Sequence, residues 1–354
     1  MYSEWDIDGA VEAGALSAQA AAAFRDHVAR SRSTVIVDEE HFRLLTGFND
    51  IFVSIAAVLM LVAMGWLGNA IRIGAPEGGP APLMGFAVAA TAWGLAEYFT
   101  RQRRMALPSI VLLLAYAGGL FIGLASLIAG HSEGDIDRAT ALLLGVAAAI
   151  TGAGVWLHWR RFHVPITVAA GAAVIAGVAL SLAFAAMPAI GERIMLVILL
   201  CGLGIFALAM KWDMSDPARL TRRSDVAFWL HLLAAPMIVH PIFSMLGLLH
   251  GSADSAKAGV VIALYLILGL VALAIDRRAL MVSALAYVIY AITSLIEQAG
   301  AVNLAFGITA LIIGSALLLL SAFWHVARGF VVALLPGAVQ GWLPQIDRPA
   351  IAAR

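Results

Sequence analysis

Cysteine is almost absent from this sequence, because Cys201 is the only one among 354 residues. A single thiol excludes an intrachain disulfide and any metal site built from several thiolates. The sequence also contains no G-x-x-x-x-G-K-[ST] phosphate loop, no H-E-x-x-H zinc helix, no G-x-S-x-G nucleophile turn and no C-x-x-C-H haem attachment. These absences disfavour an intramembrane protease and a pump driven by ATP hydrolysis, and we expect no cofactor and no metal.

Charge is scarce as well. Only 12% of the residues are charged and 62% are hydrophobic, with a mean hydropathy of +0.94, whereas a soluble domain is about a quarter charged. The formal net charge is zero, and no basic patch exceeds what membrane topology explains, so nucleic-acid binding has no support. The composition is that of a chain whose main partner is a lipid bilayer.

Ten apolar stretches follow one another along the chain, each long enough to cross a hydrocarbon core about 30 Å thick. They run near 51–71, 83–100, 106–129, 139–158, 164–187, 193–210, 225–249, 258–275, 279–298 and 303–325. The sequence therefore predicts an all-α fold, a polytopic transmembrane bundle of about ten spans at 51–325. It also predicts a cytoplasmic helical hairpin with an interfacial helix at 1–50 and an interfacial or cytoplasmic tail at 326–354.

Arginine and lysine are concentrated in alternate gaps between these spans. The gaps after spans two, four, six and eight contain Arg101, Arg103, Arg104, Arg160, Arg161, Lys211, Arg219, Arg222, Arg223, Arg277 and Arg278, whereas the opposite gaps hold Arg72, Arg138, Arg193 and Lys257. Because cytoplasmic loops carry the excess of positive charge, both termini are predicted to be cytoplasmic. We expect no removable signal peptide, so that the first span directs insertion.

Paired arginines at 103–104, 160–161, 222–223 and 277–278 recur at spacings of 57, 62 and 55 residues. This recurrence predicts an array of two-span hairpins. Short cytoplasmic turns favour arginine in any bundle, and that ordinary explanation is the stronger one. Two inverted five-span halves, as in many secondary transporters, also fit ten spans with both ends inside.

The N-terminal segment has its own helical pattern. Trp5, Ile7 and Val11 mark one short helix, and Ser17 is the expected N-cap of an alanine-rich helix from Ala18 to about residue 30. At this length the hairpin has too little core for an enzyme domain, so it is predicted to dock on the bundle or on a partner.

The stretch DEEHFRLLTGFND follows the hairpin and leads into the first span. Its Phe42, Leu45 and Phe48 lie at helical spacing, which indicates an amphipathic segment at the interface.

These features resemble a known group of proteins. The residues G-A-L-S in the N-terminal hairpin, the segment FRLLTGFNDIFV that leads into span one, and the arginine-rich turns between successive spans resemble the bacterial polytopic "predicted membrane protein" families of unknown function. The resemblance covers most of the chain. It implies a multi-pass protein of the bacterial inner membrane with an N-terminal cytosolic segment, and it implies no activity.

Span nine carries the most regular set of polar residues. Ser283, Tyr287, Tyr290, Ser294 and Glu297 are separated by four, three, four and three residues, which aligns them on one helix face over roughly 21 Å. Such a stripe is expected to face the bundle interior or a watery cavity, as the wall of a path that ends at Glu297 near the outer surface. Hydrogen bonding between helices, with the tyrosines as ordinary packing, is the commoner alternative.

Span seven contains two histidines and two prolines. Pro236 and Pro241 each remove a backbone donor and are predicted to break the helix, a device by which transporters expose backbone to substrates. His231 and His240 are nine residues apart and lie on opposite faces of a straight helix. For each histidine, a neutral imidazole bonded to a neighbouring helix is the simpler interpretation, and a proton relay, a ligand or an axial haem contact is the functional one.

Two further sets of residues yield expectations. On the cytoplasmic side Glu97, His231 and Asp50 share a similar depth, which permits a cluster, although Glu97 has the simpler option of pairing with Arg101 one turn away. In span three, Ala115, Gly119 and Gly123 form a ridge of small residues suited to close helix contact.

Two functions remain from the sequence. The first is a transporter or permease for a small molecule or ion, with Glu97, His231, His240 and the span-nine stripe as proton or substrate contacts. The second is a non-catalytic membrane scaffold or sensor that recruits a cytosolic protein through residues 1–40.

Overall fold

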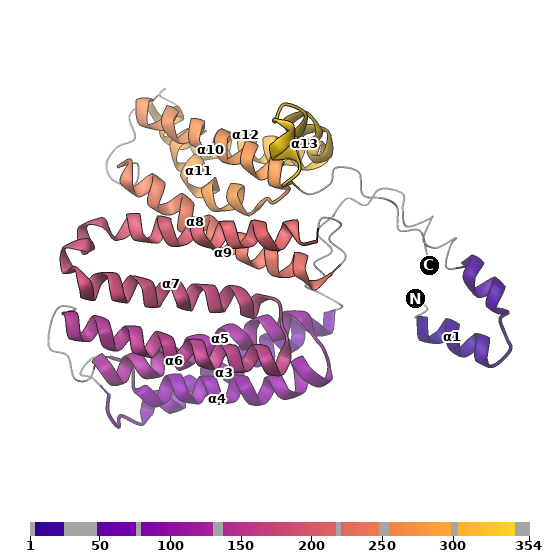
Figure 1. Cartoon of the computed structure of the whole chain (residues 1–354), viewed down its shortest axis with the longest axis horizontal. Coiled ribbons are helices and arrows are strands. Elements are labelled where there is room, and N and C mark those ends of the chain that lie inside the picture. The colour runs from indigo at the N-terminus through magenta and orange to yellow at the C-terminus, as the bar shows by residue number, and fades with distance from the viewer. Residues whose placement is uncertain are drawn as a thin grey trace. The chain divides into compact units, whose positions relative to one another are not determined.

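The computed structural model (Figure 1) describes residues 4–24, 48–75, 79–129, 137–216, 221–247, 255–298 and 304–343. Within these ranges every regular element is helical and no strand occurs. Residues 4–24 belong to a different compact unit from the long helices of 48–343. Each unit is therefore described by itself.

The N-terminal unit contains helix α1 (Glu4–Glu12) and a second helix over 18–24. The Ser17 hydroxyl accepts the Ala20 backbone N–H at 3.1 Å, which confirms the predicted N-cap. The remainder of the predicted alanine-rich helix lies outside the described residues. So does the amphipathic segment around Phe42 and Leu45.

A helix covers each of the ten predicted segments. They are α3 (Phe48–Ala70), α4 (Pro82–Ala96) continuing as the π-helical η1 (Glu97–Gln102), α5 (Ala106–Ala129), α6 (Arg138–Phe162), α7 (Ile166–Ala186), α8 (Ile194–Met214), α9 (Arg222–Met245), α10 (Ser255–Ile275), α11 (Ala279–Gln298) and α12 (Ala305–Ala322). In the described part of the chain, nine of them, all but α4, are long and apolar enough to cross a membrane. This is the helix set of a multi-pass integral membrane protein.

Three shorter elements complete the described structure. The 3-10 helix η2 (Pro188–Arg193) precedes α8, while α13 (Trp324–Ala333) and α14 (Gly337–Gln340) follow α12. Helix α13 ends at Ala333 and α14 begins at Gly337, so the helical structure of the tail is interrupted at Pro336. Residues 344–354 of that tail lie outside the described ranges.

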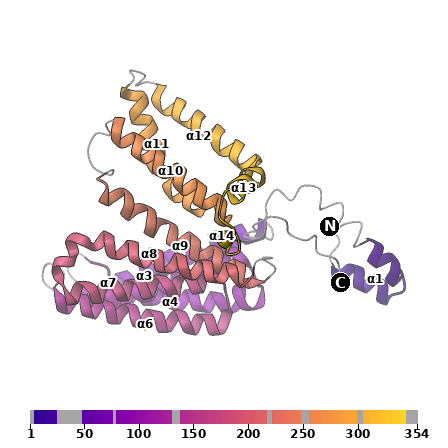
Figure 2. The same cartoon turned by 45° about the horizontal axis from the view of Figure 1, so that its top comes forward.

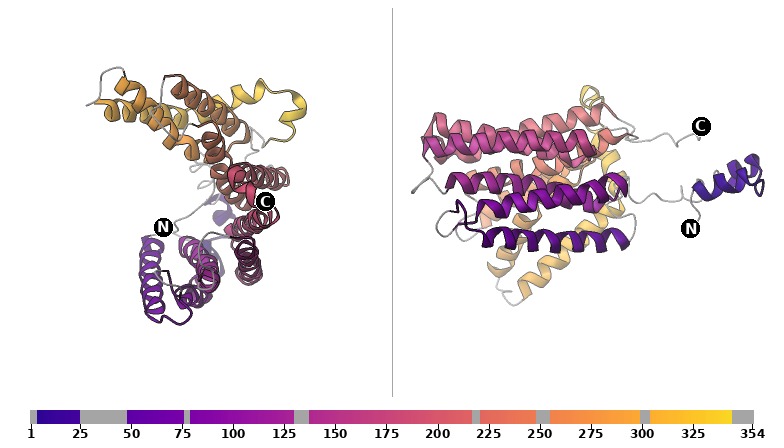
Figure 3. Two further views of the ribbon diagram at one scale, coloured as in Figure 1. Left: turned by 90° about the vertical axis from the view of Figure 1, so that its left-hand side faces the viewer. Right: turned by 90° about the horizontal axis from the view of Figure 1, so that it is seen from below.

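Consecutive helices form hairpins in the pairs α4–α5, α6–α7, α8–α9 and α10–α11 (Figures 1 and 3). The first three pairs pack most extensively, and α3 packs on α4 as extensively as α10 packs on α11. Each hairpin turns at one of the arginine-rich segments. Three of these turns contain a non-glycine residue in the left-handed region, namely Arg104, His163 and Asp276 with φ of 51°, 53° and 57°. A single such residue ends one helix and reverses the chain within a few residues.

Helix α9 links the hairpins, since it packs on α7, α8 and α11 (Figure 2). It is the most enclosed of the nine long helices, with 56% of its most apolar window buried against 17–39% in the others. A helix surrounded by protein does not have to be apolar on every face. This enclosure explains how α9 accommodates His231 and Pro241, which are buried, whereas His240 and Pro236 lie on an exposed part of the helix.

The N-terminus of α6 carries a side-chain cap that can be tested. Asp137 accepts the Thr140 backbone N–H at 2.7 Å, and this hydrogen bond lowers the pKa of the Asp137 carboxyl. The cap is therefore complete above the ordinary aspartate pKa near 4 and is lost as the pH falls through the lowered value. We expect Asp137→Ala to speed amide hydrogen exchange of residues 138–141 at pH 7, while Asp137→Ser preserves protection. Equal exchange in the two variants would show that the cap contributes nothing.

Candidate functional site

Three buried ionisable side chains meet beside α9. Asp213 near the end of α8, His231 in α9 and Arg277 in the α10–α11 turn have side chains that are only 1%, 1% and 3% exposed. His231 Nε2 lies 2.9 Å from Asp213 Oδ2, and Arg277 Nη2 donates to Asp213 Oδ1 at 2.6 Å. These three side chains are called the inner cluster below.

The geometry of the inner cluster offsets the cost of burying ions. Arg277 Nε also donates to Asp213 Oδ2 at 3.3 Å, so that the guanidinium binds the carboxylate with two nitrogens. Arg277 Nη2 further reaches the Ser224 carbonyl at 3.3 Å. A buried ion pair is stable only when its polar atoms are satisfied in this way. The cluster fastens α8, α9 and the α10–α11 turn together at the arginine-rich end of the bundle.

A second acid in the same turn, Asp276, binds two side chains of helix α13. Asp276 Oδ1 accepts the Trp324 Nε1 proton at 2.7 Å, and Arg328 Nε lies 3.8 Å from the same oxygen. Trp324 and Arg328 are 3% and 1% exposed. The turn 276–278 therefore holds α8 and α9 through Arg277, and α13 through Asp276.

Farther along α9, a hydrogen bond joins two of the predicted site residues. His240 Nδ1 lies 2.8 Å from the Tyr287 hydroxyl of α11, and the Phe243 ring stacks on Tyr287 with centroids 4.3 Å apart. Either partner can be the donor, depending on the histidine tautomer. The structure thus brings spans seven and nine into polar contact, as the hypothesis of a path between them requires.

The depth of this pair follows from helix geometry. His240 is nine residues beyond His231 and Tyr287 is ten residues beyond Arg277, which places the pair about 14 Å deeper than the inner cluster. Half of a hydrocarbon core is about 15 Å. If the inner cluster lies at the membrane boundary, His240 and Tyr287 lie close to the midplane. The two histidines are too far apart to bind one metal ion or one haem iron, and no group of three His, Cys, Asp or Glu side chains in the described ranges is arranged to hold a metal.

The rest of the predicted span-nine stripe does not form the buried face of α11. That face is apolar and consists of Leu280, Met281, Ala284, Val288 and Ala291. Tyr290 is 51% exposed, Glu297 is exposed, and Ser294 accepts a hydrogen bond from Gln298 at 3.2 Å. Helix α11 buries its small and branched side chains because they permit close packing. Tyr287 of the stripe contacts α9, through His240 and Phe243.

The prolines do not break α9, contrary to the sequence prediction. The helix runs without interruption from Arg222 to Met245 through Pro236 and Pro241. Proline at 241 still leaves the Met237 carbonyl without its usual donor. Helix α8 approaches this point closely, since a Cβ on Gly202 would lie 2.9 Å from the Met237 carbonyl oxygen. Packing by neighbouring helices is what allows proline inside a membrane helix.

Glu97 lies in a different cluster from His231, so the predicted Glu97–His231–Asp50 group is not formed. Arg161 binds Glu97 with Nε at 2.8 Å and Nη2 at 3.0 Å, and Arg101 Nη1 lies 3.3 Å away. The predicted pairing with Arg101 is therefore confirmed, although Arg161 of the next hairpin is the closer partner. The Glu97 side chain is 31% exposed, against 1% for Asp213.

The two acid–arginine pairs have the same spacing. Glu97 and Arg161 are 64 residues apart, as are Asp213 and Arg277, and the second pair lies 116 residues beyond the first. Each pair joins the first helix of one hairpin to the turn side of the next. In the sequence Arg277 was counted among the charges of a loop, and Asp213 was not singled out. Their spacing, which matches that of Glu97 and Arg161, is the signal that could have identified them.

A buried histidine that sequence analysis did not single out lies in the N-terminal half. His158 of α6 is fully buried among the rings of Trp93, Tyr116 and Phe162, and Thr167 Oγ1 is 3.4 Å from its Nδ1. Its Nε2 has no hydrogen-bond partner among the described residues. The ring stacks as a neutral aromatic group would.

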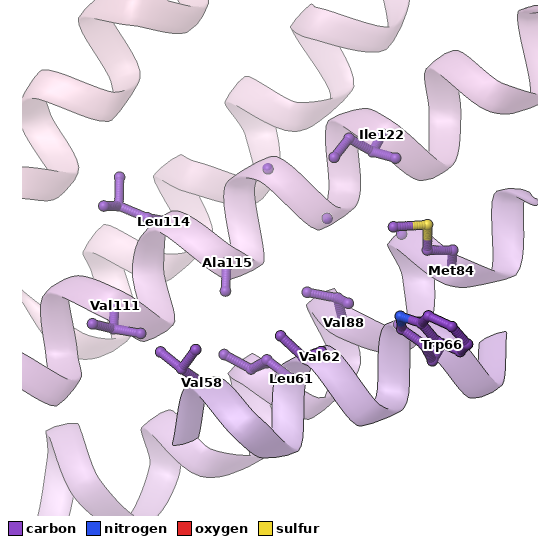
Figure 4. A pocket seen from close by; sticks show the side chains of 14 residues that line it. Val58, Leu61, Val62, Trp66, Met84, Val88, Val111, Leu114, Ala115 and Ile122 are labelled. Carbon is purple, nitrogen blue, oxygen red and sulfur yellow. The ribbon is translucent and has the colours of Figure 1, made fainter. Parts of the chain in front are cut away.

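An apolar groove of about 500 Å³ lies between α3, α4 and α5 (Figure 4). Val58, Leu61 and Trp66 of α3 face Val88 of α4 and Ala115 of α5 across it. Apart from the indole N–H of Trp66, its side chains offer no polar group. The groove therefore suits apolar contact and not chemistry.

Three comparisons with known proteins bear on identity. No family model, no curated protein and no solved structure matches this chain.

Proposed function

We propose that this protein is a transporter or permease of the bacterial inner membrane, with ten spans, both termini in the cytoplasm, and a proton path between α9 and α11. The observation that carries the proposal is the His240–Tyr287 hydrogen bond at the depth expected of the membrane midplane. The path conducts protons, or a small solute or ion that moves with them.

The presence of a histidine within a span favours a proton as the transported species. Histidine is the side chain whose charge changes near neutral pH, and ionisable groups within membrane spans mark proton relays. His240 hydrogen-bonds a tyrosine hydroxyl, which can accept one proton while it donates another. On the same helix His231 contacts the Asp213 carboxylate, which supplies a second proton-binding group nearer the arginine-rich end.

Apolar packing separates these two groups and supplies the barrier that a transporter needs. Between them α9 presents Ala234, Ala235 and Val239, all 0% exposed. The inner cluster closes the arginine-rich end because its charges satisfy one another. In this proposal the cluster is the inner gate, and its ion pairs separate when the path opens. Glu97 belongs to the other acid–arginine pair and stands outside the path.

Proton flux into liposomes tests the proposal. With purified protein reconstituted in liposomes that enclose a pH-sensitive dye, a potassium diffusion potential should drive proton entry above the rate of protein-free liposomes. His240→Gln and Tyr287→Phe should each reduce the protein-dependent rate at least tenfold, because each removes a proton-transferring atom from the pair. The matched control is His163→Asn, which removes a histidine from an exposed turn and should leave the rate unchanged. Flux equal to that of empty liposomes, or flux unaffected by both variants, contradicts the proposal.

The second candidate, a scaffold or sensor, draws on the N-terminal residues. Residues 4–24 form two short helices in a unit of their own, as expected for a segment that docks on a cytosolic protein. A scaffold would give no flux in the liposome experiment. Its partner would be captured by the full chain and released when residues 1–40 are deleted.

A further inference from the structure

The apolar groove between α3, α4 and α5 opens on the surface of the bundle (Figure 4). Its most exposed side chains come from α3 and α5, two of the helices that are long and apolar enough to cross a membrane. They are 41–79% exposed and comprise Val58, Val62, Trp66, Leu114 and Ile122. Exposed residues of membrane-spanning helices face the lipid tails, which are as apolar as leucine. The groove is therefore continuous with the lipid-facing surface of both helices.

Small residues give the groove its depth. Its lining includes Gly65 of α3 and Ala115 and Gly118 of α5. A Cβ added to Gly118 would have no atom within 4 Å, so the space beside this residue is open. Ordered water needs several polar partners, and apart from the Trp66 indole N–H the lining side chains supply none. An occupant of the groove must therefore be apolar.

The groove is long and narrow. It follows α5 from Val111 to Ile122, which is about 16 Å at the rise of a helix and close to half the thickness of a hydrocarbon core, about 15 Å. One end lies at Trp66, four residues before the end of α3 at Ala70 (Figure 4), and tryptophan is enriched at the level of the lipid headgroups. A helix of a second copy does not fit, because a cylinder about 10 Å wide needs roughly 1,200 Å³ over this length and the groove holds about 500 Å³. A single acyl chain has the right length and is narrower than a helix.

The second half of the chain carries the same helix face, and there it is covered by protein. The 116-residue offset of the two acid–arginine pairs relates α5 to α9 and α3 to α7. The residues that it matches are Leu114 with Leu230, Gly118 with Ala234, and Ile122 with Ile238. On α9 all three are at most 8% exposed and belong to one apolar cluster with three alanines of α7. Helix α3 leaves the same face of α5 open, so in the described part of the chain protein does not complete its apolar cover.

We propose that this groove binds one acyl chain of a membrane phospholipid, with the chain along α5 and the headgroup beyond Trp66. Recognition is of the chain and not of the headgroup, because no charged side chain lines the groove. The acyl chain supplies to α5 the apolar cover that α7 supplies to α9. The proposal is independent of transport, since it depends only on the groove and on the position of these helices in a membrane.

Native mass spectrometry tests this site. Delipidated protein in mild detergent is titrated with palmitoyl-oleoyl-phosphatidylglycerol, and the affinity for the first bound lipid is measured. Gly118→Leu should lower this affinity at least fivefold, because the new side chain occupies the groove. The matched control is Gly204→Leu on α8, at another exposed glycine whose Cβ would have no atom within 4 Å and which does not line the groove. It should leave the affinity unchanged. Both variants replace glycine by a better helix former, so both should remain folded.

Lipids with different chains and headgroups test what the groove recognises. In the parent protein, didecanoyl-phosphatidylglycerol should bind the first site at least fivefold more weakly than the palmitoyl-oleoyl lipid, since its chains are too short to fill the groove. Palmitoyl-oleoyl-phosphatidylcholine should bind within twofold of the phosphatidylglycerol with the same chains. A headgroup preference larger than the chain preference would assign the lipid to a charged surface and overturn the proposal.

Two further results would reject the site. If Gly118→Leu and Gly204→Leu bind the first lipid equally well, no acyl chain lies in the groove. If the parent protein is a dimer that Gly118→Leu alone dissociates, the groove accommodates side chains of a second copy instead. A phosphatidylglycerol with a diazirine in its acyl chain gives the positive counterpart. Irradiation should attach this lipid to residues 58–66 and 111–122 of the parent protein, and at least fivefold less to the same residues of Gly118→Leu.

Discussion

Arg277→Ala should destabilise the bundle by about 3–5 kcal/mol, the range typical when one partner of a buried ion pair is removed. The substitution leaves the Asp213 carboxylate buried with His231 as its remaining partner in the cluster, and it removes the contact with the Ser224 carbonyl. The free energy of unfolding is measured by SDS titration in mixed micelles, followed by far-ultraviolet circular dichroism.

The second acid–arginine pair supplies the control. Arg161→Ala breaks a contact of the same chemistry and the same 64-residue spacing, but the Arg161 side chain is 43% exposed and that of Glu97 is 31% exposed. Solvent screens such a pair, so its loss should change stability little. A double-mutant cycle with Asp213→Ala should show strong coupling to Arg277→Ala. Equal effects of Arg161→Ala and Arg277→Ala would mean that burial does not distinguish the two pairs.

The positions of the helices followed from the sequence because hydropathy is a local property. Each of the ten predicted segments is helical, and α5 spans Ala106–Ala129 with the predicted bounds. The Ser17 cap was also predictable, since an N-cap involves only the next three residues. The sequence predicted that Pro236 and Pro241 break α9, and the helix instead continues through both. The effect of a proline in a membrane helix depends on the helices that surround it, and one sequence does not show those neighbours.

The site was only partly predictable for a related reason. His240 and Tyr287 were singled out as polar residues within spans, and the structure pairs them. Asp213 and Arg277 were overlooked because they lie at span ends, where charges are ordinary. Spacing on α11 located Tyr287, but it could not tell that the helix packs through its alanines and leaves Tyr290 half exposed. Periodicity shows which residues share a face, whereas packing decides which face is buried.

The structure also bears on the internal repeat. The hairpins predicted from the arginine pairs are present as packing units. The offset of 116 residues between the acid–arginine pairs is also the offset between α5 (Ala106–Ala129) and α9 (Arg222–Met245), which have the same length. This correspondence favours a direct repeat of four helices over a repeat of two, because the match occurs at a shift of four helices. It also favours a direct repeat over inverted halves, because a four-helix shift preserves the direction of every helix.

Gly85→Ala should prevent α4 and α5 from packing and cost about 3 kcal/mol or more, at the upper end of what overpacking costs. A Cβ at position 85 would lie 2.3 Å from the Gly123 nitrogen and 2.4 Å from the Gly119 carbonyl oxygen. Both are backbone atoms, so no side chain can rotate away to make room. The predicted ridge of Ala115, Gly119 and Gly123 is thus the surface against which α4 lies, and the single methyl must separate the two helices.

Gly94→Ala on the same helix is the control that separates steric overlap with α5 from the change in helix propensity. A Cβ there meets nothing within 4 Å, and alanine is the better helix former by about 1 kcal/mol, so this variant should be as stable as the parent or more stable. The unfolding free energies come from the same SDS titration. If Gly85→Ala and Gly94→Ala prove equally stable, α4 does not approach α5 as closely as described. If only Gly85→Ala unfolds, the small-residue ridge fixes the first hairpin, since the helix propensity of α4 rises in both variants.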